Sequence, residues 1–258
     1  MKILVCIKQV PDLESRFKPD AAGLWFDEAD LAWRMNEYDE YAVEQAVQLR
    51  EQVGEEAELT VLSIGPDRVV EALKKSLAMG CDRAVHLQDP AAAQKDPWQI
   101  AGLIAAYAAG KNYDVIFTGL QSQDRGSAQV GVTLAERLGM GCVTTLVGFS
   151  YSDGVITAKR ELEGGIKGVA KLRIPALVTC QLGLNVPRYP TLPNIMKAKR
   201  KELEAIPVAS LASEDPRATT LRFYPPAKKG GGLVLEGEVS ALVEQLFGIL
   251  KDKTAVLR

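Results

Sequence analysis

The sequence DVIFTGLQSQDRGSAQVGVTLAERL, from Asp114 to Leu138 in this chain of 258 residues, decides the fold that we expect. Its first part, residues 114–119, is apolar and rich in branched side chains, which is typical of a buried strand. Its last part, residues 127–138, has helical spacing and stops before Gly139, where a helix commonly ends. The stretch therefore predicts a strand, a polar loop and a helix in that order.

The alternation of strand and helix continues toward the N-terminus. Single helices between strands favour right-handed crossovers and a parallel sheet with helices on both faces. The sequence therefore predicts a doubly wound, mostly parallel α/β domain of the Rossmann-like, adenine-nucleotide-binding type. The expected strands are residues 2–10, 59–64 and 83–87, and the expected helices are residues 38–53, 67–79 and 97–109.

The pattern changes after residue 142. Strands joined by turn signals there predict β hairpins added to the main sheet, and a proline-rich tail with a last amphipathic helix predicts an extended C-terminal arm. The tail has too little apolar content to fold alone, so it is expected to cover its own domain or a partner. The expected strands are residues 143–151, 155–162 and 169–180, and the last helix is residues 240–250. We therefore expect an α/β domain, residues 1–185, and a partner-recognition loop with a C-terminal arm, residues 186–258.

Composition excludes several classes of protein. Hydrophobic residues make up 47% and charged residues 25% of the chain, which excludes a disordered chain or a coiled coil. The net charge of −2 gives no support for nucleic-acid binding, and no apolar run approaches the roughly 18 residues of a membrane span. Cys6, Cys81, Cys142 and Cys180 are far apart and His86 is the only histidine, so no metal site is expected. Scattered cysteines are typical of a reducing compartment, and we expect a cytoplasmic protein.

The loop from Gly119 to Gly131 is the best candidate for a binding site, because open parallel sheets bind ligands beyond the carboxyl ends of their strands. Small residues there precede a helix, whose first N–H groups favour a phosphate. The alternative is an ordinary polar loop in which Ser127 caps the helix.

Known reaction signatures are missing from the sequence. No G-x-G-x-x-G follows the first expected strand and no P-loop occurs, which argues against a dinucleotide dehydrogenase or a P-loop ATPase. No G-x-S-x-G marks a serine nucleophile, and His86 lies in an apolar strand, which indicates a core residue. The residues alone therefore predict a nucleotide-binding domain without visible catalytic machinery.

Four segments carry motifs of one family. They are KILVCIKQVPD (residues 2–12), the loop 119–131, RELEGG (160–165) followed by IPALVT (174–179), and NVPRYPTLPNIMKAK (185–199). Together they resemble the beta subunits of electron transfer flavoproteins over nearly the whole chain. The sequence departs from that family at Lys167-Gly168, where Glu or Gln often follows the glycine pair.

The resemblance implies a heterodimer whose alpha subunit carries most of the FAD site. Electrons would arrive from acyl-CoA or related dehydrogenases, as in fatty acid oxidation, and leave to the membrane ETF-quinone oxidoreductase. The chain would be a subunit of an electron carrier in the bacterial cytoplasm rather than an enzyme, and it would not itself be embedded in the membrane.

The family has two branches, which differ in the nucleotide of the beta subunit. LPNIMKA (residues 192–198) and Met35-Asn36 resemble the branch that binds structural AMP. AQVG (residues 128–131) is also common in electron-bifurcating members, which hold a second FAD and oxidise NADH, although Asp124-Arg125-Gly126 replaces their usual Asp-Gly-Asp. We expect AMP and keep the bifurcating alternative open.

The family's AMP contacts, carried onto this chain, imply a site of three parts. Cys6 would lie beside the adenosine, residues 36–39 would frame the base and ribose, and Ile64 would close the pocket; core packing is the alternative for Cys6 and Ile64. The loop would bind the phosphate mainly through backbone N–H groups, with Asp124 orienting backbone or capping the helix. The implied nucleotide-binding residues are Cys6, Asn36, Glu37, Tyr38, Asp39, Ile64, Gly119, Leu120, Gln121, Ser122, Gln123, Asp124, Arg125, Gly126, Ser127, Ala128, Gln129 and Val130.

Residues 185–199 resemble the family's partner-recognition loop, which implies that Leu192, Pro193, Ile195 and Met196 bind a dehydrogenase. Leu192, Ile195 and Met196 form an apolar stripe at i, i+3 and i+4, for which a short core helix is the alternative. Glu161 matches a family position that faces the mobile flavin domain, where it is expected to pair with a basic residue of the alpha subunit. A small nucleotide-sensing protein of the universal-stress type is the alternative from another class. It would leave the long arm after residue 186 without a purpose.

Overall fold

The structure, a computed structural model, describes residues 1–212, 214–227 and 230–255. Contacts divide the chain into a first unit, Met1–Phe223, and a second unit, Tyr224–Arg258. The second unit contains α6 (Val239–Lys253), close to the expected helix at 240–250. The division of the chain at residue 186 concerns partner binding and stays a prediction.

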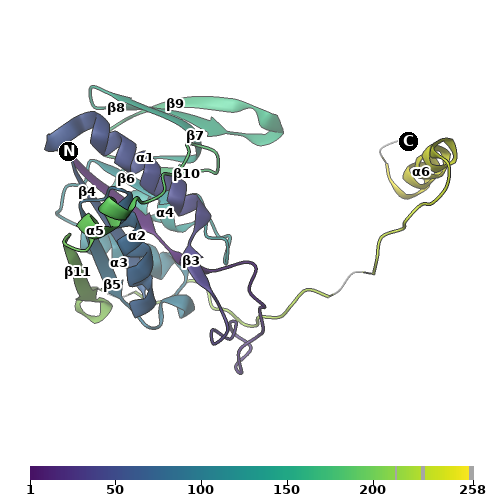
Figure 1. Cartoon of the computed structure of the whole chain (residues 1–258), viewed down its shortest axis with the longest axis horizontal. Helices are drawn as coiled ribbons and strands as arrows, with labels where there is room; N and C mark the ends of the chain where they lie inside the picture. Colours follow the sequence, from purple (N-terminus) through teal and green to yellow (C-terminus); the bar gives the residue numbers. More distant parts are fainter. Residues whose placement is uncertain (213, 228–229, 256–258) are drawn as a thin grey trace. The chain divides into compact units, whose positions relative to one another are not determined.

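A sheet of nine strands forms the centre of the first unit (Figure 1). Its strand order is β11-β5-β4-β1-β6-β10-β7-β8-β9, and every neighbouring pair is parallel except the two pairs that involve β8. This arrangement confirms the doubly wound, mostly parallel α/β fold. The strands are β1 (Lys2–Ile7), β4 (Glu58–Gly65), β5 (Arg83–Gln88), β6 (Val115–Gly119), β7 (Gly141–Ser152), β8 (Val155–Glu161), β9 (Lys167–Arg173), β10 (Ala176–Cys180) and β11 (Leu203–Pro207).

Helices cover both faces of the sheet, as the alternation of side chains along β1 shows. Ile3, Val5 and Ile7 belong to the apolar cluster that includes α1 and α2, whereas Leu4 and Cys6 belong to the cluster that includes α3 and α4. Successive side chains of a strand point to opposite faces, so a central strand must be apolar throughout. The helices of the first unit are α1 (Glu37–Val53), α2 (Val70–Met79), α3 (Pro97–Ala108), α4 (Val130–Leu138) and the short α5 (Leu192–Ala198).

The helix ends follow from local sequence. Asp96 and Gln99 form a capping box at the start of α3, with Pro97 in the first turn. In α1 the first turn is acidic and Arg50 lies in the last turn, which complements the helix dipole. These signals explain why the expected helices lie close to the observed ones.

The order of the strands indicates where a ligand is expected to bind to the sheet. β1 pairs with β4 on one side and with β6 on the other. The chain first runs from β1 through β4 to β5 and later returns past β1 to form β6. The topological switch point therefore lies between β1 and β6, and open α/β sheets bind ligands at such a point.

The expected strand at residues 169–180 is two strands in the structure. It breaks at Ile174-Pro175, because proline has no N–H for a strand ladder. β7, β8 and β9 form the predicted hairpins, whereas β10 lies between β6 and β7 in the interior of the sheet. The expectation of one strand was therefore wrong.

Two boundaries and one additional strand also differ from expectation. The first strand ends at Ile7, and Gln9–Pro11 forms β2, which pairs with β3 (Trp33–Met35) in a separate small sheet. The last βα helix begins at Val130 rather than Ser127, and its N-terminal neighbour Gln129 makes no side-chain cap. β11 was not expected at all. No helix in the described part of the chain combines the length and apolar content needed to cross a bilayer.

Candidate nucleotide pocket and docking segment

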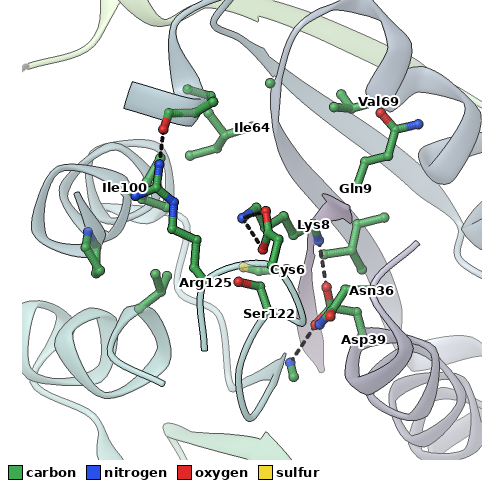
Figure 2. Close-up of a pocket in the computed structure, with 18 of the residues that line it drawn as sticks. Cys6, Lys8, Gln9, Asn36, Asp39, Ile64, Val69, Ile100, Ser122 and Arg125 are labelled. Carbon is green, nitrogen blue, oxygen red and sulfur yellow. Dashed lines mark hydrogen bonds and ion pairs between the residues drawn. The ribbon is translucent and has the colours of Figure 1, made fainter. Parts of the chain in front are cut away.

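A cavity of about 190 Å³ lies at the switch point (Figure 2). Its walls come from the carboxyl ends of β1, β4 and β6, from the start of α1, and from the loop between β6 and α4. Cys6, Ile64 and Ile100 give it apolar surface, whereas Lys8, Asp39 and Arg125 bring charge to it. A small apolar cavity with a few convergent polar groups is typical of a ligand site.

Asp39 joins the elements that meet at this point. One carboxyl oxygen accepts the Lys8 N–H at 2.7 Å and the other accepts the Gly119 N–H at 3.1 Å. Lys8 follows β1, Gly119 ends β6 and Asp39 itself lies in the first turn of α1. The carboxyl group is 5% exposed, and this burial raises its pKa to about 7 although the two N–H bonds oppose the shift.

Asn36 shapes the loop beside the pocket. Its Nδ2 donates to the Gln121 carbonyl at 2.9 Å, and its Oδ1 accepts the Gln123 N–H at 3.0 Å. Behind the loop, the side chain of Gln123 donates to Glu37 and that of Gln121 donates to Tyr38. The start of α1 therefore fixes the path of the loop from one side.

Asp124 lies inside this loop and pairs with Lys8, with a distance of 2.6 Å between its Oδ2 and the Nζ. It was expected to orient backbone or to cap α4, but its carboxylate instead neutralises the lysine, and α4 has no side-chain cap. The Lys8–Asp124 ion pair therefore lies beside the start of α4, and the Asp124 carboxylate is not a free negative charge there.

The backbone at the start of α4 forms an anion-binding concavity. Ala128 has φ of +52° and is followed by Gln129 in the right-handed region, a combination that turns successive N–H groups to one side. The N–H groups of residues 127–129 donate to no acceptor within the described chain. The first N–H groups of α4 add to them, because a helix leaves these unpaired. This backbone fits a phosphate.

Three buried polar atoms in the pocket wall lack a hydrogen-bond partner among the described residues, and one of them is Nε of Arg68. Gln9 is 7% exposed; its Nε2 donates to the Arg68 carbonyl at 3.0 Å, which leaves Oε1 unpaired. The indole Nε1 of Trp25 is also buried and unpaired. Such atoms cost about 1–3 kcal/mol each when nothing binds them, so they indicate that the pocket is built for a polar ligand.

Most of the predicted nucleotide residues come together here. The residues of that set that line the pocket are Cys6, Asn36, Asp39, Ile64, Gly119, Leu120, Gln121, Ser122, Asp124, Arg125, Ser127, Ala128, Gln129 and Val130. Glu37, Tyr38, Gln123 and Gly126 do not line it. Cys6 and Ile64 both pack in the core and face the pocket, so the two readings of these residues are compatible.

Several lining residues were not predicted. Trp25 and Trp33 reach the pocket from a segment that carries no motif of the family and no periodic pattern, whereas Arg68 lies near the start of the helix expected at residues 67–79. His86 lies outside the pocket lining, and its buried Nε2–H donates to the Gly65 carbonyl at 2.8 Å, which confirms its core role. Within the described chain, no group of three or more His, Cys, Asp or Glu residues is arranged to hold a metal ion.

A second candidate surface is the docking segment, residues 186–196. Leu192 is 73% exposed and Tyr189 90% exposed, and Pro193, Ile195 and Met196 are also exposed. The predicted partner residues are therefore available for binding. Ala198, one helical turn further on, is buried in the core cluster and anchors α5.

Arg188 holds the docking segment against α1. Its guanidinium donates two hydrogen bonds to Glu44, at 2.8 and 3.0 Å, and two to Glu51, at 2.6 and 3.0 Å. Glu44 is 3% exposed and also accepts the Arg188 backbone N–H. Two-pronged arginine–carboxylate pairs fix geometry strongly.

Glu161 ends β8 and is exposed. The side chain of Gln181 donates to its carboxylate at 3.3 Å. The position is accessible to another chain, and its role in pairing with an alpha subunit stays a prediction.

The sheet order and the pocket at its switch point define a doubly wound α/β protein with a site suited to a phosphate-bearing ligand. A profile described as the electron transfer flavoprotein domain matches residues 23–211. Among curated relatives, the electron transfer flavoprotein beta subunit of Bacillus subtilis (strain 168) is 34% identical over 100% of both chains. That of Methylophilus methylotrophus is 34% identical over 98% of each chain, and that of Mus musculus is 33% identical over 98% of this chain and 97% of its own.

The profile match ends within the first unit, whereas the alignment to the Bacillus subtilis relative extends over the full chain. The chain belongs to the electron transfer flavoprotein family, and within it the chain is similar from end to end to the beta subunits.

We predict that Asp39→Asn removes a pH dependence of stability. Between about pH 4 and pH 7 the folded carboxyl group keeps a proton that the unfolded chain has lost, so this group makes stability fall as pH rises, by up to about 1.4 kcal/mol per pH unit. Chemical denaturation at pH 5 and pH 7 should show wild type losing stability relative to the variant at the higher pH. Asp114→Asn, which removes a carboxylate that accepts the Lys2 N–H, is the control. An equal pH effect in both variants would contradict the assignment to Asp39.

We also predict that Arg188→Gln frees the docking segment. Glu44 would stay buried without its cation, which should lower the free energy of unfolding by about 1–3 kcal/mol and speed amide exchange in residues 186–196. Hydrogen-exchange mass spectrometry is the measurement. Arg200→Gln, an exposed arginine beyond α5, is the control and should leave the segment unchanged. Unaltered exchange in the Arg188 variant would show that other contacts hold the segment.

Proposed function

We propose that this chain is the beta subunit of a heterodimeric electron transfer flavoprotein, with AMP as a structural ligand in its pocket. FAD would be held mainly by the alpha subunit. The single observation that carries the nucleotide proposal is the row of unpaired N–H groups at residues 127–129, at the switch point of the sheet.

The pocket residues suit a structural rather than a reactive role. Burial raises the pKa of the Cys6 thiol well above its ordinary value, so the thiolate that reacts or binds metals does not form. His86 is occupied in the core, and Lys8 is paired with Asp124. Cys6, Lys8 and the other side chains that line the pocket would bind and orient a nucleotide and exclude water from it, while the flavin of the alpha subunit would supply the redox chemistry.

The nucleotide would stabilise the pocket by joining its separate walls. The N–H groups before α4 would bind its phosphate, Asn36 and Asp39 hold the facing wall, and Cys6 and Ile64 would contact its apolar part. A ligand that binds only the folded state adds to stability by mass action.

Two exposed surfaces suit the proposed partners. α6 presents Val239, Val243, Leu246 and Phe247 on one stripe, and such an amphipathic helix is expected to pack on the alpha subunit. The docking segment would bind acyl-CoA or related dehydrogenases, with Leu192 entering a shallow pocket of the partner. The membrane quinone oxidoreductase would accept the electrons.

The alpha subunit would also meet the edge of the sheet at β8 and β9. Leu162, Ile166 and Val169 are exposed there, next to Glu161. A surface ion pair of Glu161 would contribute only about 0–1 kcal/mol, which is enough to bias the position of a mobile domain.

Acid release of nucleotides from the copurified heterodimer, followed by chromatography against AMP and FAD standards, tests the proposal. We expect one AMP and one FAD per heterodimer. Two FAD and no AMP would place the protein in the electron-bifurcating branch, an enzyme that oxidises NADH, which the AQVG sequence of residues 128–131 also matches. No bound nucleotide beyond the FAD of the alpha subunit would contradict a nucleotide site in this chain.

Leu192→Ala tests the docking segment. Because the side chain is 73% exposed, we expect slower reduction by the dehydrogenase, by about tenfold, with unchanged FAD content and melting temperature. Stopped-flow reduction is the measurement, and Leu221→Ala, which removes another exposed leucine, is the control. Lost flavin or a lower melting temperature would assign Leu192 to the core instead.

A further inference from the structure

Trp25 forms part of the pocket wall and is held from behind by other aromatic rings. Its ring lies 4.0 Å from that of Phe26, whose ring is 5.4 Å from Phe17 and 6.0 Å from Phe223. The backbone N–H of Phe223 donates to the Gly23 carbonyl at 2.7 Å. The segment before α1 is therefore tied down, and Trp25 has a defined place in the wall of the pocket.

Arg125 closes the same side of the pocket. Its guanidinium stacks on the Trp25 ring at 4.0 Å, donates to the Ala93 carbonyl and lies 3.5 Å from the Thr220 hydroxyl. The side chain thus extends from the β6–α4 loop toward the chain before α3. Cation–aromatic stacking of this kind fixes an exposed guanidinium.

Arg125 differs from the other pocket cations in that they have carboxylate partners. Lys8 pairs with Asp124 and Arg68 pairs with Glu28. Within the described residues, Arg125 has no carboxylate at ion-pair distance. It is therefore the pocket cation whose charge is open to an anionic ligand.

Trp25 has an unused donor as well. Its Nε1 is buried without a hydrogen-bond partner, although its ring is part of the pocket wall. Arg125 and Ala128 are three residues apart, so the stacked pair and the unpaired N–H groups before α4 border the same pocket. Both sets consist of donors alone, and an oxygen-rich anion satisfies donors best.

We propose that Trp25 and Arg125 form a phosphate clamp, in which Trp25 Nε1 and the Arg125 guanidinium each donate to a phosphate oxygen of the bound nucleotide. The clamp rests on the proposed nucleotide function and adds to it two side chains that select a nucleoside monophosphate over the uncharged nucleoside. Arg125 leaves the Ala93 carbonyl when it binds the phosphate, whereas the stacking on Trp25 persists.

The test compares AMP with adenosine, which differ only by the phosphate. Trp25→Phe keeps an aromatic ring and removes the indole N–H. Arg125→Gln removes the positive charge of the guanidinium and its paired N–H donors. Lys111→Met removes a cation stacked 4.6 Å over Tyr107, a pair that does not line the pocket, and serves as the matched control. Each full-length chain is coexpressed with the alpha subunit, freed of nucleotide, and titrated by calorimetry with AMP and with adenosine.

We expect each clamp variant to raise the Kd for AMP about tenfold or more and to change the Kd for adenosine less than about twofold. The control should change neither. An equal loss for AMP and adenosine, or no loss for either, would overturn the clamp and leave the nucleotide function standing. A wild-type complex that binds neither compound would overturn both.

Discussion

The pocket depends on one buried carboxyl group. Asp39 receives an N–H from the residue after β1 and another from the last residue of β6, so a single side chain joins both strands of the switch point to α1. The contact is so close that a Cβ at Gly119 would lie 2.1 Å from Asp39 Oδ1 and 2.8 Å from Tyr38 Cβ. Only glycine allows this approach of strand and helix.

α1 links the pocket to the docking segment. Its first turn holds Asp39, and further along the same helix Glu44 and Glu51 bind Arg188. The same helix thus supports both the candidate nucleotide pocket and the docking segment. The contact between Glu44 on α1 and Arg188 is important for stability because Glu44 is buried, and a buried carboxylate requires its cation.

Much of the fold could be predicted because it depends on local pattern. The apolar run of β1, the capping box at Asp96 and Gln99, and the glycines after helices are signals within a few residues of the structure that they determine. The loop at residues 119–131 could be found for the same reason, since its position after a strand and before a helix marks the ligand edge. The sequence pattern did not show that the chain breaks at Pro175 or that β10 then lies between β6 and β7. The hydrophobic pattern of a strand does not indicate which other strands become its neighbours.

The parts of the site that sequence reasoning missed depend on contacts between distant residues. Trp25 meets Arg125 across 100 positions of sequence, and Arg188 meets Glu44 across 144. Neither pairing follows a periodic pattern, and tryptophan in a polar segment is not by itself a sign of a binding site. Asp124 illustrates the opposite error: a carboxylate beside a helix start was expected to act locally, but a lysine 116 positions away neutralises it.

The place of β10 has a consequence for the order of assembly during synthesis. β10 fills the position between β6 and β7, although β7, β8 and β9 all precede it in the chain. Until residue 180 has left the ribosome, β6 therefore has one unpaired edge and the β7–β9 hairpins have no connection to the central strands. Pairing of such distant segments is slow because loop closure must precede it. The nascent chain thus exposes the facing edges of β6 and β7 during this interval, and both are closed at once when five buried residues, Ala176–Cys180, take their place.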